Sequence, residues 1–179
     1  MNKSLLAIAL CVATAAPAQD MGPIAQIELW RHSRLTAMRT SEGTVLAPFT
    51  TDGCSGGMSS VWRAVAQVFP KFREVQGEVP PWEGCCVIHD EAYHLGGQDT
   101  SPLASYQARL VSDEQLRSCV RAVARVDGPA LRDRYGEPQE TIEAAFDFIA
   151  DGMFEAVRLG GAPCSGLPWR WGYGWPQCW

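Results

Sequence analysis

The amino-acid sequence predicts an all-α protein, on two observations. Apolar residues recur at intervals of three and four along several segments, which is the period of a helix that buries one face. The alternation of apolar and polar residues that is typical of strands is nearly absent from the 179 residues. We therefore expect helices that pack on helices around a common hydrophobic core.

The N-terminal segment predicts export. Lys3 precedes the apolar run LLAIALCVATAA, and the stretch APA at residues 16–18 is a small-x-small site of the kind that signal peptidase cuts. The run is short for a membrane span. We therefore predict a signal peptide over residues 1–18 and a secreted or periplasmic mature chain, residues 19–179. An N-terminal core helix or a membrane anchor is the alternative.

Removal of this peptide changes the cysteine and charge counts. The chain has 7 cysteines, and 6 stay once Cys11 leaves, an even number that suits three disulfides in an oxidising compartment. Lysine and arginine total 15 against 20 acidic residues, and the loss of Lys3 makes this 14 against 20. A net negative chain disfavours nucleic acid as the partner. About 160 residues suit a single domain with its own core.

Two predicted helices lie in the first half of the chain, over residues 25–38 and 59–69. Their expected buried residues are Ile27, Trp30, Leu35 and Met38 in the first and Val61, Val65 and Val68 in the second. Two segments rich in turn residues, 46–57 and 73–84, are predicted as loops.

Two longer helices are predicted in the second half. Residues 105–126 contain neither glycine nor proline and suit about six helical turns. The other helix begins near Pro138, which a first turn tolerates, and ends at Gly160-Gly161. Its expected apolar stripe consists of Ile142, Ala145, Phe146, Ile149, Met153, Phe154 and Val157.

The C-terminal stretch, residues 161–179, has too many glycines and prolines for a helix. A local disulfide between Cys164 and Cys178 is the simplest account of it. Its tryptophans are Trp169, Trp171, Trp175 and Trp179. We favour packing of these indoles on the core, and docking at a membrane interface is the alternative.

The remaining predicted helix starts after Pro80-Pro81, ends at Gly96 and carries most of the reactive side chains. At about 100° per residue, five of them fall within one arc of about 140°, namely Cys85, Cys86, His89, Asp90 and Tyr93. The arc is expected to face inward, where buried polar groups need partners. His94 lies opposite the arc and is interpreted as structural, and His32 has no visible partner.

The run CCVIHDEAY, residues 85–93, resembles the active-site helix of the secreted phospholipase A2 superfamily. That helix has two cysteines, two variable residues, His-Asp and a tyrosine three residues after the aspartate. Upstream, TTDGCSGG is similar to the family's calcium loop, and its TDGC form looks more like the bacterial and fungal branch than the animal enzymes. The resemblance covers roughly residues 50–120. The chain departs from the family in a longer interval between Cys54 and Cys86.

The resemblance implies a fold built on a disulfide-stapled pair of antiparallel helices, a calcium-binding loop and additional packing helices. It implies an aspartate on the second helix, six residues before a cysteine, and SDEQLRSC supplies Asp113 and Cys119. If Cys85 bonds Cys119, Asp113 lies about 9 Å from the disulfide along its helix, and His89 lies about 6 Å from it along the other helix. The difference between these distances is within side-chain reach. Glu114, at about 7.5 Å, stays open as the alternative. The other pairs implied are Cys54–Cys86 and Cys164–Cys178.

The chemistry that the resemblance implies is calcium-dependent hydrolysis of a phospholipid ester at a membrane or micelle surface. His89 would be the general base, Asp113 would orient it, and Tyr93 would hydrogen-bond the carboxylate. Asp90 and the Gly53 carbonyl would bind Ca²⁺, the only expected cofactor. The bacterial version adds the Asp52 side chain, and the animal version adds the carbonyls of Ser55 and Gly57. The N–H of Ser55 would complete the oxyanion site.

Two function classes stay open at this point. The first is a phospholipase A2-like hydrolase that releases a fatty acid, and the second is a catalytically silent member that binds lipid or a protein. Intact His89, Asp90 and an acid in register favour the enzyme. A thiolate metal site is disfavoured because Cys85 and Cys86 are adjacent and the chain is exported. The sequence predicts neither a protein partner nor an oligomeric state.

Overall fold

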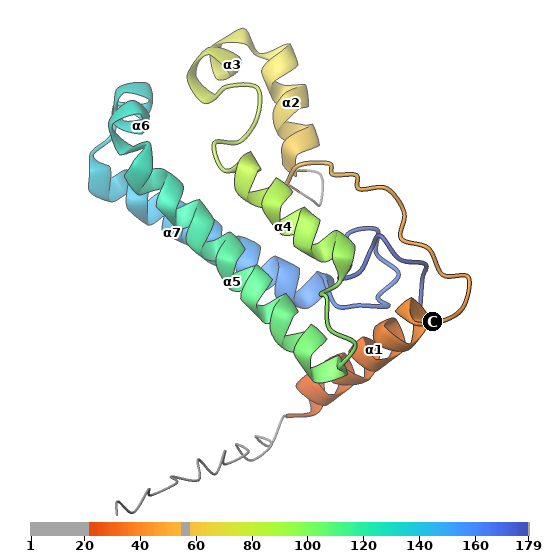
Figure 1. Ribbon diagram of the computed structural model, residues 1–179. Coiled ribbons are helices and arrows are strands. Elements are labelled where there is room, and N and C mark those ends of the chain that lie inside the picture. The colour runs from red at the N-terminus through yellow and green to blue at the C-terminus, as the bar shows by residue number, and fades with distance from the viewer. Residues whose placement is uncertain (1–21, 55–57, 179) are drawn as a thin grey trace, which may run out of the picture.

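The computed structural model describes residues 22–54 and 58–178, and all of its regular elements within these ranges are helices (Figure 1). The predicted all-α class is therefore confirmed for the described residues. Among these helices, none combines the length and the apolar character that a membrane span needs. The predicted signal peptide, residues 1–18, lies outside the described residues.

The helices differ from the predicted ones mainly in number. In chain order they are α1 (Pro23–Arg39), α2 (Met58–Val68), α3 (Pro70–Gln76), α4 (Glu83–Leu95), α5 (Pro102–Val126), α6 (Gly128–Tyr135) and α7 (Gln139–Gly160). The helices α3 and α6 are additional to the prediction. α3 overlaps the segment 73–84 that was predicted as a loop, and it ends at Gly77, whose φ of 80° suits glycine. Both short helices have proline in the first turn, where its missing N–H costs nothing.

Helix α5 lies at the centre of the molecule and packs against α1, α4 and α7. α4 and α5 run side by side in opposite directions (Figure 1), and the Cys85–Cys119 disulfide joins them. A second disulfide, Cys54–Cys86, joins the segment before α2 to α4, and Cys164–Cys178 closes the C-terminal segment. These are the pairs that the sequence analysis expects, and three disulfides fit an extracellular or secreted protein.

Two hydrophobic clusters surround this centre. The larger one lies between α4, α5, α6 and α7 and includes Trp82, Leu116, Val120 and Phe146. The smaller one joins α1, α4 and the C-terminal segment through Leu35, Tyr93, Trp171 and Cys178. The C-terminal segment folds back on the end of α4, since Gly172 N donates to Tyr93 O over 2.6 Å. Trp171, 1% exposed, thus packs in the core, whereas Trp179 lies outside the described residues.

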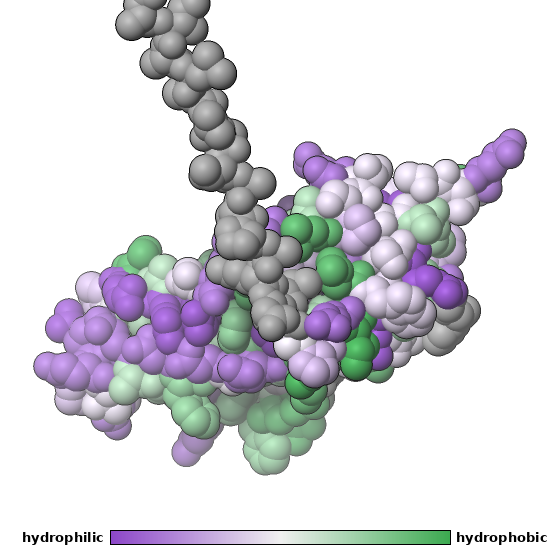
Figure 2. All heavy atoms as spheres, turned by 90° about the horizontal axis from the view of Figure 1, so that it is seen from below, coloured by the Kyte–Doolittle hydropathy of each residue, from purple (hydrophilic) through white to green (hydrophobic). Residues whose placement is uncertain are grey.

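The faces predicted for the first two helices are partly right, since Leu35 is buried and Met38 and Val65 are half-buried. Ile27 and Trp30 of α1, however, are each 57% exposed, and the helix also buries the polar residues Glu28, His32 and Thr36. The physical reason is that the neighbours of α1 offer arginine and hydroxyl partners, which stabilise buried polar groups. In α2, Val61 and Val68 are exposed because this helix packs mainly on the short α3. Apolar side chains reach the surface in separate patches between hydrophilic ones, as Figure 2 shows for one face.

Candidate functional site

His89 and Asp113 lie next to each other in the interior, between α4 and α5. His89 Nε2 is 2.9 Å from Asp113 Oδ1, and Tyr93 Oη donates to the same oxygen over 2.7 Å. His89 is 7% exposed and Asp113 is fully buried. Because a carboxylate accepts, the proton of neutral His89 lies on Nε2, which leaves Nδ1 as the basic nitrogen. Glu114, the open alternative, instead pairs with Arg117 over 2.5 Å.

Two arginines and a glutamate lie behind this pair. Arg158, from α7, donates to Asp113 Oδ2 over 2.9 Å and to the two carboxylate oxygens of Glu28 over 3.0 and 2.8 Å. Arg109, from α5, pairs with the same Glu28 and donates from Nε to Tyr93 Oη over 3.1 Å. Its Nη2 also donates to two carbonyl oxygens near the end of α7. The two guanidinium charges balance the two carboxylates.

The pKa values in this cluster follow from its contacts. Burial raises the pKa of Glu28, but His32 and the charges of Arg109 and Arg158 lower it more, to about 2. Burial raises the pKa of Tyr93 well above its ordinary value, so its hydroxyl keeps the proton that it donates to Asp113. The cluster therefore places paired charges and a phenol that keeps its proton around the imidazole of His89.

Sequence reasoning missed Glu28, Arg109 and Arg158. A signal existed for two of them, because Arg109 precedes Asp113 by four residues and so lies on the same helical face, and Glu28 precedes His32 by four. Nothing local indicated Arg158. The expectation that His32 lacks a partner is wrong, since its Nδ1 lies 2.9 Å from Ser105 Oγ. His94 bonds the Ala47 carbonyl through Nε2 over 2.9 Å, as a structural histidine does.

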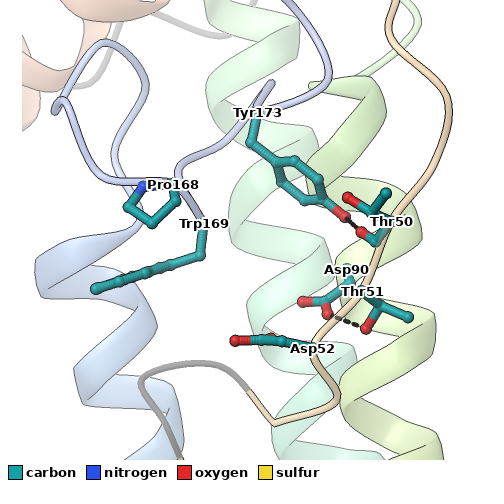
Figure 3. A pocket seen from close by; sticks show the side chains of 7 residues that line it. All are labelled: Thr50, Thr51, Asp52, Asp90, Pro168, Trp169 and Tyr173. Atoms are coloured by element: carbon teal, nitrogen blue, oxygen red, sulfur yellow. Dashed lines mark hydrogen bonds between the residues drawn. The ribbon is translucent and has the colours of Figure 1, made fainter.

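A second group of polar residues lines a pocket of about 250 Å³ beside Asp90 (Figure 3). Thr51 Oγ1 donates to Asp90 Oδ2 over 2.6 Å, and Gly53 N donates to that hydroxyl over 3.0 Å. Asp52 projects into the same space. Tyr173 also lines the pocket and donates to Thr50 O over 2.6 Å. Burial raises the pKa of Tyr173, and the charges of Asp90 and Asp52 raise it further. We call this space the carboxylate pocket.

The oxygens of the carboxylate pocket have the chemistry that Ca²⁺ prefers, because carboxylates, carbonyls and hydroxyls are hard donors. Gly53 has a φ of 81° and a side chain there would collide with Glu83 and Ser59, so the chain is held close at this point. Over residues 22–54 and 58–178, however, no three His, Cys, Asp or Glu side chains form a group that could hold a metal ion. Two of the predicted ligands, Ser55 and Gly57, lie outside these ranges.

An apolar pocket of about 100 Å³ adjoins His89, and Asp90 lines this pocket too. Methionines, aliphatic residues and the Cys54–Cys86 disulfide supply most of its lining, which includes Met58, Leu116, Met153, Ala156 and Val157. His89 and Tyr93 form part of its wall. His89 borders the apolar pocket, and its neighbour Asp90 lines both pockets, so the pair of pockets suits a molecule with one apolar and one polar end.

Comparisons of the chain with protein-family models, with curated proteins and with solved structures found no match. The class of site therefore follows from its geometry, which combines a buried imidazole oriented by a carboxylate with a pocket of oxygen donors and an apolar pocket. Such an arrangement can accept a proton from water at His89.

Proposed function

We propose that the chain is a secreted, calcium-dependent hydrolase of the phospholipase A2 type, which releases a fatty acid from glycerophospholipids. The observation that supports the proposal most is the contact of 2.9 Å between His89 Nε2 and Asp113 Oδ1. The imidazole is nearly buried and forms part of the wall of the apolar pocket, and the neighbouring Asp90 lines both that pocket and the carboxylate pocket. The resemblance of residues 85–93 to the family's active-site helix points to the same chemistry.

In this mechanism His89 Nδ1 takes a proton from water, and the oxygen of that water attacks the carbonyl carbon of the ester. The ester C–O bond then breaks, and His89 returns the proton to the leaving alkoxide. Asp113 stabilises the imidazolium and holds the ring orientation, as a carboxylate does in other histidine dyads. Tyr93 and Arg158 hold the two oxygens of Asp113 in place. No protein nucleophile is needed.

The residues that would hold the metal are Asp90, Asp52 and the Gly53 carbonyl, together with the Ser55 and Gly57 carbonyls in the alternative loop arrangement. Bound Ca²⁺ supplies a positive charge that polarises the carbonyl of the ester. The buried Asp90 has a Thr51 hydroxyl on one carboxylate oxygen, which orients the group toward the pocket that it shares with Asp52. The N–H of Ser55 remains the proposed donor to the oxyanion.

The experiment measures fatty-acid release from phosphatidylcholine vesicles by the mature chain, in calcium and in excess chelator. We expect release in calcium only, and its loss in His89→Ala and Asp113→Asn. Glu114→Gln is the matched control, because its carboxylate adjoins Asp113 in sequence and pairs with Arg117 instead of His89.

Calcium-independent release, or equal release by Asp113→Asn and Glu114→Gln, contradicts the proposed mechanism. Vesicle binding without release by the unaltered chain would favour the silent lipid-binding module. Binding of the vesicles is measured by sedimentation in the same preparations.

A further inference from the structure

Trp169 lies at the boundary between the carboxylate pocket and the apolar pocket. Among the described residues that line the two pockets, Asp90 and Trp169 alone line both. Asp90 belongs to α4, whereas Trp169 belongs to the C-terminal segment, and Figure 3 shows it across the pocket from Asp90 and Asp52. The indole is half-buried, so one part of it contacts protein and another part faces the pockets.

The segment that carries Trp169 is held at both ends. The Cys164–Cys178 disulfide closes it. Backbone hydrogen bonds tie it to the end of α7, through Trp171 N and Gly161 O at 2.8 Å, and to the end of α4. A side chain at Gly160 would contact the indole nitrogen at 3.6 Å, so Trp169 packs against the last turn of α7. The same helix supplies Met153, Ala156 and Val157 to the apolar pocket.

The two pockets that Trp169 lines differ in chemistry and size. Threonine and aspartate oxygens join Pro168 and aromatic rings in the first, whereas mainly aliphatic groups and sulfur atoms line the second. The apolar pocket holds about 100 Å³. Pockets for drug-sized ligands hold roughly 300–1,000 Å³. An acyl chain beside His89 therefore has little room in the apolar pocket, and the indole of Trp169 is one of the side chains that bound this room.

We propose that Trp169 is a specificity-determining residue of the ester hydrolysis and that it makes short acyl chains better substrates than long ones, which are still hydrolysed more slowly. This inference rests on the proposed function. The indole forms part of the wall of the apolar pocket beside His89, where the acyl chain would lie. Its removal enlarges that pocket and gives a longer chain more room.

The test compares the mature chain with Trp169→Ala and Trp169→Phe. Hydrolysis in calcium is measured on monomeric phosphatidylcholines with two butanoyl, hexanoyl or octanoyl chains. The corresponding dialkyl ethers, which cannot be hydrolysed, are titrated in parallel by calorimetry. Trp30→Ala is the control, because this indole on α1 is exposed and lines neither pocket.

We expect the unaltered chain and Trp30→Ala to prefer the shortest chains in both kcat/KM and binding. In Trp169→Ala the ratio of long-chain to short-chain kcat/KM rises about tenfold or more, since a hydrophobic pocket discriminates one methylene by about that factor. The ratio for Trp169→Phe lies between the ratio of the unaltered chain and that of Trp169→Ala. The ether affinities shift in the same direction.

If Trp169→Ala has the same chain-length profile as the unaltered chain in both rates and ether affinities, the inference is overturned. The proposed function still holds in that case, provided that hydrolysis needs His89. If the unaltered chain hydrolyses none of the esters, the proposed function fails, and the ether affinities alone then decide the role of Trp169. Equal shifts in Trp30→Ala also overturn it, because that indole is remote from both pockets.

Discussion

The two sides of His89 differ in how their polar groups are satisfied. We define the inner side as five residues from four helices, namely Asp113, Tyr93, Arg109, Arg158 and Glu28. Their carboxylates, phenol and guanidinium groups hydrogen-bond one another. We define the outer side as Thr51, Asp52, Asp90 and Trp169. These residues line the two pockets, and all of them except Asp90 lie in loops. Buried charges keep a fixed geometry only when they are paired, whereas groups that bind a ligand must face an opening.

This difference indicates a division of roles. The inner side holds the imidazole, and the outer side is where a cation and a substrate would bind. Changes on the inner side should therefore reduce the stability of the fold as well as activity, while changes on the outer side should reduce activity alone. The predictions below test this separation, from the largest expected effect to the smallest.

His89→Ala removes the group that both sides share. We expect fatty-acid release to fall about 10³-fold, because a positioned general base contributes roughly 10²–10⁴ to a rate. Release is measured on phosphatidylcholine vesicles in saturating calcium, and circular dichroism checks that the helices are intact. Retention of a tenth or more of the activity by a folded variant would remove His89 from the mechanism.

Arg158→Met breaks the inner side. It leaves Asp113 and Glu28 with one guanidinium group between them, and we expect a loss of about 3 kcal/mol in the free energy of unfolding. Arg117→Met is the control, because its ion pairs with Glu114 and Asp151 are more exposed and should contribute less than about 1 kcal/mol. Both are measured by urea unfolding at pH 7. Equal losses in the two variants would show that the inner side is no more than a surface ion-pair network.

Asp90→Asn alters the outer side. We expect activity to fall about 10²-fold with a higher calcium requirement, because one charged ligand of a hard cation is lost, while the free energy of unfolding without calcium changes by less than about 1 kcal/mol. Calcium titrations of fatty-acid release measure the first effect and urea unfolding the second. Asp133→Asn on the surface of α6 is the control. An unchanged calcium requirement would exclude Asp90 as a ligand.

Glu28→Gln tests the smallest effect, the pH dependence of the inner side. The pKa of Glu28 is about 2 in the folded protein against 4.5 ordinarily, so its contribution is present above pH 4.5 and is lost as pH falls toward 2. We expect the unaltered chain to lose roughly 1–2 kcal/mol more than Glu28→Gln over this interval. Thermal unfolding between pH 7 and pH 2 measures the difference, and parallel curves would contradict it.

Local patterns predicted much of α4 and little of α1. In α4, the five reactive residues share one arc because helical geometry repeats regardless of what surrounds it, and five of its buried residues are Cys85, Cys86, His89, Asp90 and Tyr93. In α1, the same reasoning selected Leu35 and Met38, which are buried and half-buried, but also Ile27 and Trp30, which are exposed. Hydrophobicity predicts a buried face only where the neighbours are apolar, and the neighbours of α1 include Arg109 and Arg158.

By itself, the sequence determined the helical class, the inward arc of α4 and, through the phospholipase A2 resemblance, the expected neighbours of His89 and the cysteine pairs. These depend on spacing within a segment or on a motif. Only the tertiary structure decided that Glu28 and Arg158, 130 positions apart in sequence, meet behind Asp113, and that Trp169 lines both pockets. Contacts of this kind depend on how whole helices and a disulfide-closed segment pack in space, and no local period of the chain encodes that packing.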